Sequence, residues 1–170
     1  MATSQAQLKI GTGVKFNGEA GADVAFSMEG IASAAGRVST QYDLGASPRD
    51  GLFMWHASLF LQATTPVQGK TVDFYAAAAY DAVATMIWGD IGATDAALGD
   101  VDQLRNLLFL GSVVIEEANT TIMVGGGVFE FPYRYISIVM HNNATGATTN
   151  ATDSNMLFFL QPYNWQGQAT

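Results

Sequence analysis

The chain has 170 residues, which is long enough for one domain with a substantial core and short for two. Its net charge of −8 argues against nucleic-acid binding, which needs a basic surface, and the absence of Cys excludes disulfides and thiolate chemistry. The first residues lack a signal-peptide pattern, and no run approaches the roughly 18 apolar residues of a membrane span. We therefore expect a soluble protein, synthesised in the cytoplasm, that does not bind membranes.

Charged residues make up only 13% of the chain, against roughly 25% in typical domains. Charge depletion is typical of the buried centres of protein interfaces, so one interpretation is that other subunits cover much of the surface. The other interpretation is an ordinary acidic domain. Composition alone leaves both open.

Three strand candidates lie in the N-terminal part of the chain, each with apolar residues at alternate positions: Leu8–Phe16, Ala22–Ile31 and Arg37–Leu44. The residues before Leu8 carry no pattern and are a candidate for an arm that orders only on a neighbouring subunit. We therefore divide the chain into an N-terminal arm with the first strand, residues 1–20, and a single β-sandwich domain, residues 21–170.

Two long strands are predicted in the middle of the chain, at Leu52–Gln62 and Thr71–Tyr80. Their period-two pattern and the short separation between them predict an antiparallel pair. The tract Ala76–Ala79 also suits a helix, but the aromatic and β-branched residues around it favour a strand.

The longest irregular segment is Asp81–Arg105, which is rich in Gly, Ala and Asp. A loop of this length inside a compact domain is usually functional or forms an interaction element. A short helical turn is predicted at Asp100–Leu107. The aspartates are too loosely spaced for the converging oxygen ligands of a calcium site, so we expect no metal.

Strand character resumes at Leu108–Glu117, and Thr121–Val124 is predicted to run back after a tight turn. We expect the run Gly125–Gly127 to break that strand before Val128–Phe131, because glycine permits a sharp bend. The glycine run does not predict a phosphate-binding loop, since no Lys-Ser/Thr pair follows it and no helix opens after it. We expect no cofactor.

The chain is organised around two apolar runs, Tyr133–Met140 and Met156–Tyr163, on either side of the polar stretch His141–Asn155. Both runs are apolar on both faces, which is expected of strands that lie between layers or under a partner subunit. We interpret them as two long central strands joined by an ordered surface loop. With the other candidates they make eight to ten strands, which predicts an all-β fold, an antiparallel β-sandwich of jelly-roll type.

No catalytic motif is visible. His56 and His141 are the only histidines, neither has an acid or nucleophile nearby in sequence, and His56 is expected to be a hydrogen-bonded structural imidazole. A Ser-His-Asp arrangement assembles in space and stays open as an alternative, but no GxSxG elbow supports it. We therefore expect a protein that is not an enzyme, with no catalytic residues.

The three tryptophans are candidates for recognition. Trp55 is expected in the core, whereas Trp88 and Trp165 lie outside the predicted strands and are candidate anchors of a protein interface, where Trp is enriched. The alternative is that Trp88 and Trp165 form a platform for sugars.

Three stretches carry a resemblance to a known group of proteins. They are GRVSTQYDLGASPRDGLFMWHASLFLQ, then TVDFYAAAAYDA with an acidic spacer and LRNLLFLGSVVIEE, and then FPYRYISIVMHNNATGATTNATDSNMLFFLQPY. In order and wording they resemble a group of virion structural proteins of tailed bacteriophages, over roughly residues 36–163. No catalytic motif defines that group.

The resemblance implies a β-sandwich and a structural role in the virion. It implies a decoration or cement protein on the outer capsid surface that contacts the major capsid protein and neighbouring copies of itself, as a homo-oligomer. The alternative function is a carbohydrate-binding adhesin module of a head or tail fibre.

Overall fold

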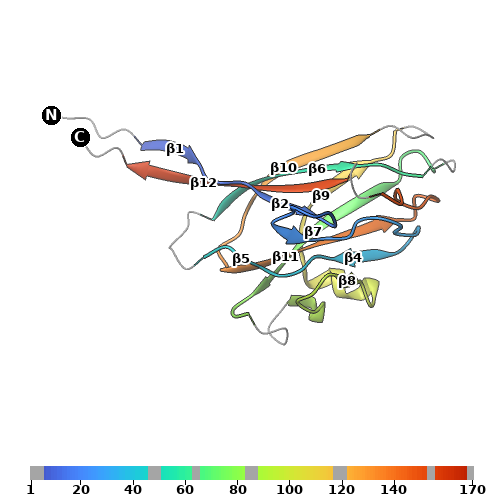
Figure 1. Ribbon diagram of the computed structural model, residues 1–170, viewed down its shortest axis with the longest axis horizontal. Helices are drawn as coiled ribbons and strands as arrows, with labels where there is room; N and C mark the ends of the chain where they lie inside the picture. Colours follow the sequence, from blue (N-terminus) through green and yellow to red (C-terminus); the bar gives the residue numbers. More distant parts are fainter. Residues whose placement is uncertain are drawn as a thin grey trace.

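The computed structural model describes residues 6–45, 51–62, 66–82, 88–116, 122–152 and 156–167, with side chains described from residue 10 to residue 163 within these ranges. These residues form two six-stranded sheets that lie one above the other (Figure 1). Paired strands are antiparallel except β2 and β3, which are parallel. The predicted all-β fold, an antiparallel β-sandwich, is confirmed.

Sheet A has the order β10-β6-β12-β2-β3, with β1 paired to β12. Its strands are β1 (Ala6–Ile10), β2 (Val14–Asn17), β3 (Val24–Ala25), β6 (Leu52–Leu59), β10 (Met123–Glu130) and β12 (Leu157–Gly167).

Sheet B has the order β8-β4-β11-β7-β9, with β5 paired to β11. Its strands are β4 (Gly36–Val38), β5 (Tyr42–Asp43), β7 (Thr71–Ala79), β8 (Ala96–Ala97), β9 (Leu108–Val114) and β11 (Tyr135–Asn143). Two short 3₁₀ helices, η2 (Trp88–Asp90) and η3 (Val101–Asn106), flank β8 in sequence.

The count of twelve strands in the described residues exceeds the predicted eight to ten: two predicted strands are each divided and β8 forms inside a predicted loop, whereas two predicted strands merge into β10. Leu8–Phe16 becomes β1 and β2, and Arg37–Leu44 becomes β4 and β5. Only Val24–Ala25 of the predicted strand Ala22–Ile31 is extended into a ladder. A jelly-roll connectivity stays a prediction, as does the domain boundary after residue 20; β2, before that boundary, pairs with β12 inside sheet A.

The main core lies between the sheets and centres on aromatic rings. Trp55 of β6 stacks on Phe158 of β12 with ring centroids 5.8 Å apart, and Phe74 of β7 reaches both rings from the opposite sheet, at 5.7 Å and 5.3 Å. All three side chains are buried. The expectation that Trp55 belongs to the core is confirmed.

The segment of residues 88–107 covers part of the outer face of sheet B and creates a second, smaller core. Ile91 and Leu104 from this segment pack there with Val38, Val139 and the outward alanines of β7. The Ala76–Ala79 tract is therefore buried on both faces, Ala76 and Ala78 in the main core, Ala77 and Ala79 in the second. Small side chains let the covering segment approach the sheet, and the prediction of a strand at this tract is confirmed.

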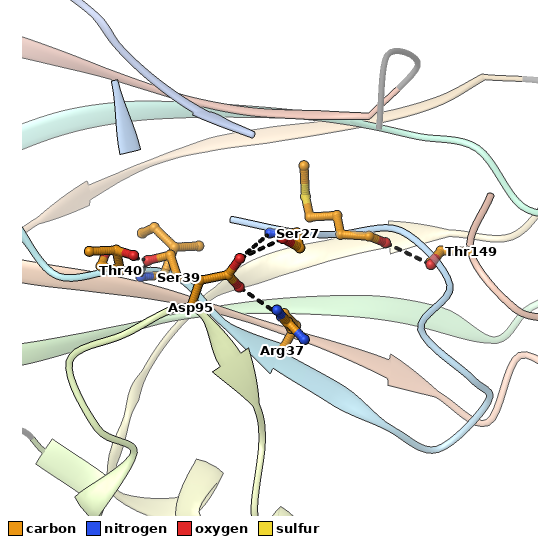
Figure 2. A network of polar contacts seen from close by, with 8 residues as sticks. Ser27, Arg37, Ser39, Thr40, Asp95 and Thr149 are labelled. Atoms are coloured by element: carbon orange, nitrogen blue, oxygen red, sulfur yellow. Dashed lines mark hydrogen bonds and ion pairs between the residues drawn. The ribbon is translucent and has the colours of Figure 1, made fainter. Parts of the chain in front are cut away.

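Asp95 ties the covering segment to the rest of the sandwich (Figure 2). Its Oδ1 accepts a hydrogen bond from Arg37 Nε at 2.7 Å, and its Oδ2 accepts from the backbone N–H and the hydroxyl of Ser27 at 3.1 Å and 2.5 Å. Burial raises the pKa of the Asp95 carboxyl, but the hydrogen bonds from Arg37 and Ser27 outweigh it, so that the pKa lies below its ordinary value. The covering segment is thus held by charge as well as by apolar contact.

The predicted helical turn at Asp100–Leu107 is confirmed by η3. Asp100 caps this helix by accepting a hydrogen bond from Asp102 N at 2.8 Å, and Gln103 Oε1 accepts from Asp100 N at 3.1 Å, so that the two residues form a capping box.

Two sequence-based expectations about pairing are wrong. β6 and β7 do not pair with each other: they lie in opposite sheets and meet across the core through Trp55 and Phe74. Gly125–Gly127 does not break a strand, since β10 runs through it in continuous register with β6. Glycine is needed there for close approach: a Cβ at Gly127 would lie 2.8 Å from Trp55 Nε1, and one at Gly125 would lie 2.7 Å from Val113 Cγ2.

The predicted surface loop His141–Asn155 is more deeply placed than expected, and its first three residues belong to β11. Asn142, Thr145, Ala147 and Thr149 are buried. Asn142 Nδ2 donates to the carbonyl oxygens of Ile31 and Ala147 at 3.1 Å and 2.8 Å. Thr149 Oγ1 donates to Met28 O at 2.7 Å (Figure 2). The polar composition of this segment serves internal hydrogen bonds, because a buried backbone needs partners for its amide and carbonyl groups. Residues 153–155 of the predicted loop lie outside the described residues.

Within the described ranges, no helix has the length and apolar character needed to cross a membrane.

Candidate interaction surface

The outer face of sheet A carries an apolar patch made by three neighbouring strands. Buried and exposed residues alternate along most of β6, half-buried and exposed residues alternate along most of β10, and the outward positions are largely apolar. Cross-strand register places Val128, Met54 and Gln161 in one row, Gly126, His56 and Phe159 in the next, and Val124, Ser58 and Leu157 in a third. We call the set Met54, His56, Val124, Gly126, Val128, Leu157 and Phe159 the sheet A patch.

The sheet A patch is hollowed into a groove of about 550 Å³ whose lining is almost wholly apolar. Gly126 supplies no side chain, which leaves space on β10 next to Val128 and opposite His56 of β6. Val124 and Val128 are each 64% exposed. Charged side chains occur only at its rim among the described residues, with Lys15 beside Phe159 and Glu130 at the end of β10.

A two-stranded ribbon continues from the sheet A patch. β12 pairs with β6 as far as Tyr163, and its remaining residues pair with β1. β1 and the end of β12 project side by side from the body of the sandwich, at the left of the view (Figure 1). A two-stranded ribbon is at best marginally stable in water, and its free edges present backbone N–H and C=O groups to any strand that can pair with them.

The half-buried outer face of β12 contrasts with the covered outer face of β11. Both strands are apolar on both faces, and the sequence left open whether such strands lie between layers or under a partner. The outer face of β11 lies under the covering segment of residues 88–107. The outer residues Leu157 and Phe159 of β12 lie on the sheet A patch and are half-buried. Gly13 passes close to the Phe159 ring, since a Cβ at Gly13 would collide with that ring.

The structure places the two candidate anchors on different elements. Trp88 opens η2, is half-buried, and packs against Tyr133 with ring centroids 4.9 Å apart. Trp165 lies in the ribbon opposite Leu8, so it belongs to strand β12 and not, as expected, to a segment outside the strands. Their role as interface anchors stays a prediction.

Sequence reasoning missed the residues of the sheet A patch as a site. The signal was present in the apolar outward positions of β6 and β12, but the glycine run was interpreted as a break. The third strand of the patch, with Val124 and Val128, was therefore not joined to the other two.

The two histidines differ in environment. His56 is exposed on the sheet A patch, so the expected structural role for this imidazole is wrong. His141 is buried in sheet B, and its Nε2 has no hydrogen-bond partner among the described residues.

His141 lies in register with Asp73 of β7, which lies in register with Ser112 of β9. Ser112 Oγ donates to Asp73 Oδ1 at 2.6 Å, and Asn143 Nδ2 donates to Asp73 Oδ2 at 3.1 Å. A catalytic triad needs the imidazole between the hydroxyl and the carboxylate. Here the carboxylate lies between the hydroxyl and the imidazole, so the cluster does not have the order of a triad.

Three aspartates of the covering segment are engaged in structural contacts. Asp95 binds Arg37, Asp100 caps η3, and Asp102 lies 3.1 Å from Arg105. In the part of the chain that the structure describes, no three His, Asp or Glu residues converge as metal ligands would.

A scan against protein-family models, a search of curated proteins and a search of solved structures each found no match to this chain.

Proposed function

We propose that the chain is a non-enzymatic structural protein of a tailed-bacteriophage virion, a decoration protein that binds the outer capsid surface and stabilises contacts between major capsid subunits. The sheet A patch and the ribbon are its binding elements. One observation carries the proposal: β12 belongs to both, so an apolar face and an open strand edge form one continuous surface.

The chemistry of the sheet A patch supports protein contact. Contiguous apolar surface on a protein marks an interaction site, and interface centres are depleted of charge. Burial of each exposed valine or half-buried aromatic of the patch under a partner would stabilise the complex, by about 25 cal/mol per Å² of apolar surface removed from water. A low charge content over the whole chain agrees with this use.

The ribbon supports attachment to an extended segment of a partner. An exposed edge can accept a further strand, in which main-chain hydrogen bonds supply affinity. Binding of many identical copies to one lattice makes weak single contacts effective. The partners are therefore the major capsid protein and neighbouring copies of this chain, which would form a homo-oligomer on the lattice.

The assignment to a capsid, as opposed to another assembly, is supported by the resemblance over roughly residues 36–163. Those residues include β6, β7, β9, β10 and β11 and the part of β12 that lies on the sheet A patch. The location is then the capsid surface of the virion, after synthesis in the host cytoplasm.

A matched pair of substitutions tests the proposal. Val128→Glu places a charge in the sheet A patch, and Val114→Glu places the same charge at an exposed strand position of sheet B. Both variants should fold with wild-type melting temperatures, because both side chains are exposed. Purified protein is added to capsids that lack it, and the bound fraction is measured by sedimentation.

We expect Val128→Glu to bind at least about tenfold more weakly than wild type, since desolvating an unpaired carboxylate costs more than 1.4 kcal/mol. Val114→Glu should bind as wild type does. Equal binding of the two variants would contradict the assignment of this face.

A further inference from the structure

A second surface lies on the opposite side of the sandwich and goes beyond the proposed function. It is a cleft of about 510 Å³ between the covering segment and the outer face of sheet B. Side chains from three neighbouring strands and from η3 line it, among them Asp73, Tyr75, Arg105, Phe109, His141 and Asn143. These residues lie far apart in sequence and are brought together by the strand order β11-β7-β9.

A β-bulge in β9 shapes this cleft. Asp73 pairs with Ser112 and Phe74 with Gly111, but Tyr75 pairs with Phe109, so Leu110 is an extra residue. In a regular strand, residues 109 and 112 would point to opposite faces, because side chains alternate. The bulge lets Phe109 lie beside Tyr75 while Ser112 bonds to Asp73, on one face of the sheet. Bulges of this kind re-aim side chains and are frequent next to functional sites.

The carboxylate of Asp73 is fixed in place at the floor of the cleft. It is 7% exposed, and its two oxygens accept from Ser112 Oγ and Asn143 Nδ2. Asn143 Nδ2 also faces Thr71 Oγ1 at 3.4 Å, which leaves the Asn143 carbonyl oxygen as an acceptor. His141 adds a third polar side chain to the lining.

An aromatic wall stands beside this polar floor. Phe109 is 55% exposed, and its ring meets the ring of Tyr75 edge to face with centroids 5.4 Å apart. Burial and, second, the charge of Asp73 raise the pKa of the Tyr75 phenol, so its hydroxyl is neutral and can donate and accept. An exposed ring next to fixed hydrogen-bonding groups can hold a ligand that is apolar on one face and polar at its edge.

The charges of the cleft select against anions. Arg105 at the rim lies 3.1 Å from the carboxylate of Asp102, so these two charges offset each other. The carboxylate of Asp73 then gives the cleft a net negative charge. A ligand with a carboxylate or phosphate would be repelled, whereas a neutral ligand with hydroxyl groups can donate to Asp73.

We propose that this cleft binds a neutral pyranose unit of a glycan, with a C–H face of the sugar against Phe109 and adjacent hydroxyls on Asp73 and Asn143. The site lies on sheet B and the sheet A patch lies on sheet A, so glycan binding and capsid binding are separable. The site also differs from the sugar platform suggested by Trp88 and Trp165, since Trp88 does not line the cleft and Trp165 belongs to strand β12 of sheet A.

The test is a titration of the full chain, followed by the amide NMR signals of β7, β9 and β11. The probes are the methyl glycosides of glucose, galactose, mannose and N-acetylglucosamine at millimolar concentrations, with N-acetylneuraminic acid as an anionic comparison. At least one neutral glycoside is expected to shift signals around the cleft and to bind more tightly than the anion.

Variants assign the effect to the cleft. Phe109→Ala should weaken binding about tenfold. Tyr80→Ala is the matched control, since Tyr80 is 65% exposed and also packs edge to face on another ring, that of Tyr133 at 5.6 Å. Asp73→Asn should also weaken binding. The proposal is overturned if none of the neutral glycosides shifts these signals, if Phe109→Ala and Tyr80→Ala bind alike, or if the anion binds best.

Discussion

Phe158 lies in the centre of the main core, where its ring meets those of Phe16, Trp55 and Phe74 at centroid distances of 5.3 to 5.8 Å. Replacing Phe158 with Ala leaves a cavity between two rigid sheets, so we expect a loss of about 3–5 kcal/mol in the free energy of unfolding. Urea denaturation measures this loss. Phe74→Ala should cost a similar amount, and because the two rings touch, the double variant should deviate from additivity.

Tyr80→Ala is the control for these core variants, since this exposed side chain should change stability by no more than about 0.5 kcal/mol. Near-neutral results at both Phe158 and Phe74 would mean that the two sheets do not meet at these residues.

Asp95 makes stability depend on pH in a direction that the structure fixes. Its pKa in the folded chain lies below the ordinary value, so its contribution is fully present above the unfolded-state pKa of about 3.9 and is lost as the pH falls through the folded-state value. Asp95→Asn should therefore cost about 1–3 kcal/mol at neutral pH, and this difference should shrink below about pH 3.9.

Denaturation of wild type and Asp95→Asn across this pH range measures the effect. Asp102→Asn is the control, because its ion pair with Arg105 is exposed and contributes little. A difference between wild type and Asp95→Asn that stays constant into strong acid would show that the charge of Asp95 has no part in holding the covering segment.

At the scale of elements, the bulge in β9 depends on Gly111. This residue has φ of 150°, a value that other residues rarely adopt, and a Cβ would lie 2.7 Å from Trp55 Cζ2. Gly111→Ala should lower the free energy of unfolding by about 1–3 kcal/mol through backbone strain and by a further 1–3 kcal/mol through overpacking against Trp55. Gly21→Ala is the matched control, since Gly21 has φ of 94° but open space around its Cα.

Thermal or urea denaturation compares the two glycine variants. Gly111→Ala should lower the free energy of unfolding more than Gly21→Ala does, and the difference should equal the packing contribution, because both variants carry the backbone strain. Equal losses would indicate that the sheets can separate locally to accept a side chain at the bulge.

The sequence was sufficient to predict the long strands, because their apolar residues repeat with period two, as in β6 and β7, or form an unbroken run, as in β11. It was not sufficient to predict which strands pair. Consecutive strands often pair, but β6 and β7 are joined across the sandwich, and no local pattern distinguishes a hairpin from such a crossing. Strands as short as β3, β5 and β8 have no period to detect.

The two candidate surfaces were hidden from sequence for different reasons. Val124 and Val128 could be joined to Met54 and Phe159 only once β10 was known to continue through its glycines. The cleft over sheet B depends on an extra residue in β9 and on a strand order that places Asp73 beside Asn143. Neither the bulge nor the strand order leaves a motif in the sequence.

At the scale of the whole molecule, the two outer faces of the sandwich are unequal: the chain's own segment covers part of sheet B, whereas Met54, Val124 and Val128 of the sheet A patch are exposed. Deleting residues 1–10 removes β1, which pairs only with the end of β12 among the described strands. The sandwich should keep its melting temperature within a few degrees, while binding to capsids should weaken. A large loss of thermal stability would show that β1 belongs to the folding unit and not to an attachment element.

The most direct test of the proposed role is the stability of virus particles with and without the chain. A protein that binds the assembled shell stabilises that state by mass action. Particles lacking the chain should therefore assemble but break at a lower temperature, or under milder osmotic shock, than complete particles, and added wild-type protein should restore resistance where Val128→Glu does not. Unchanged resistance of the deficient particles, together with impaired adsorption to host cells, would contradict a decoration role and favour an adhesin.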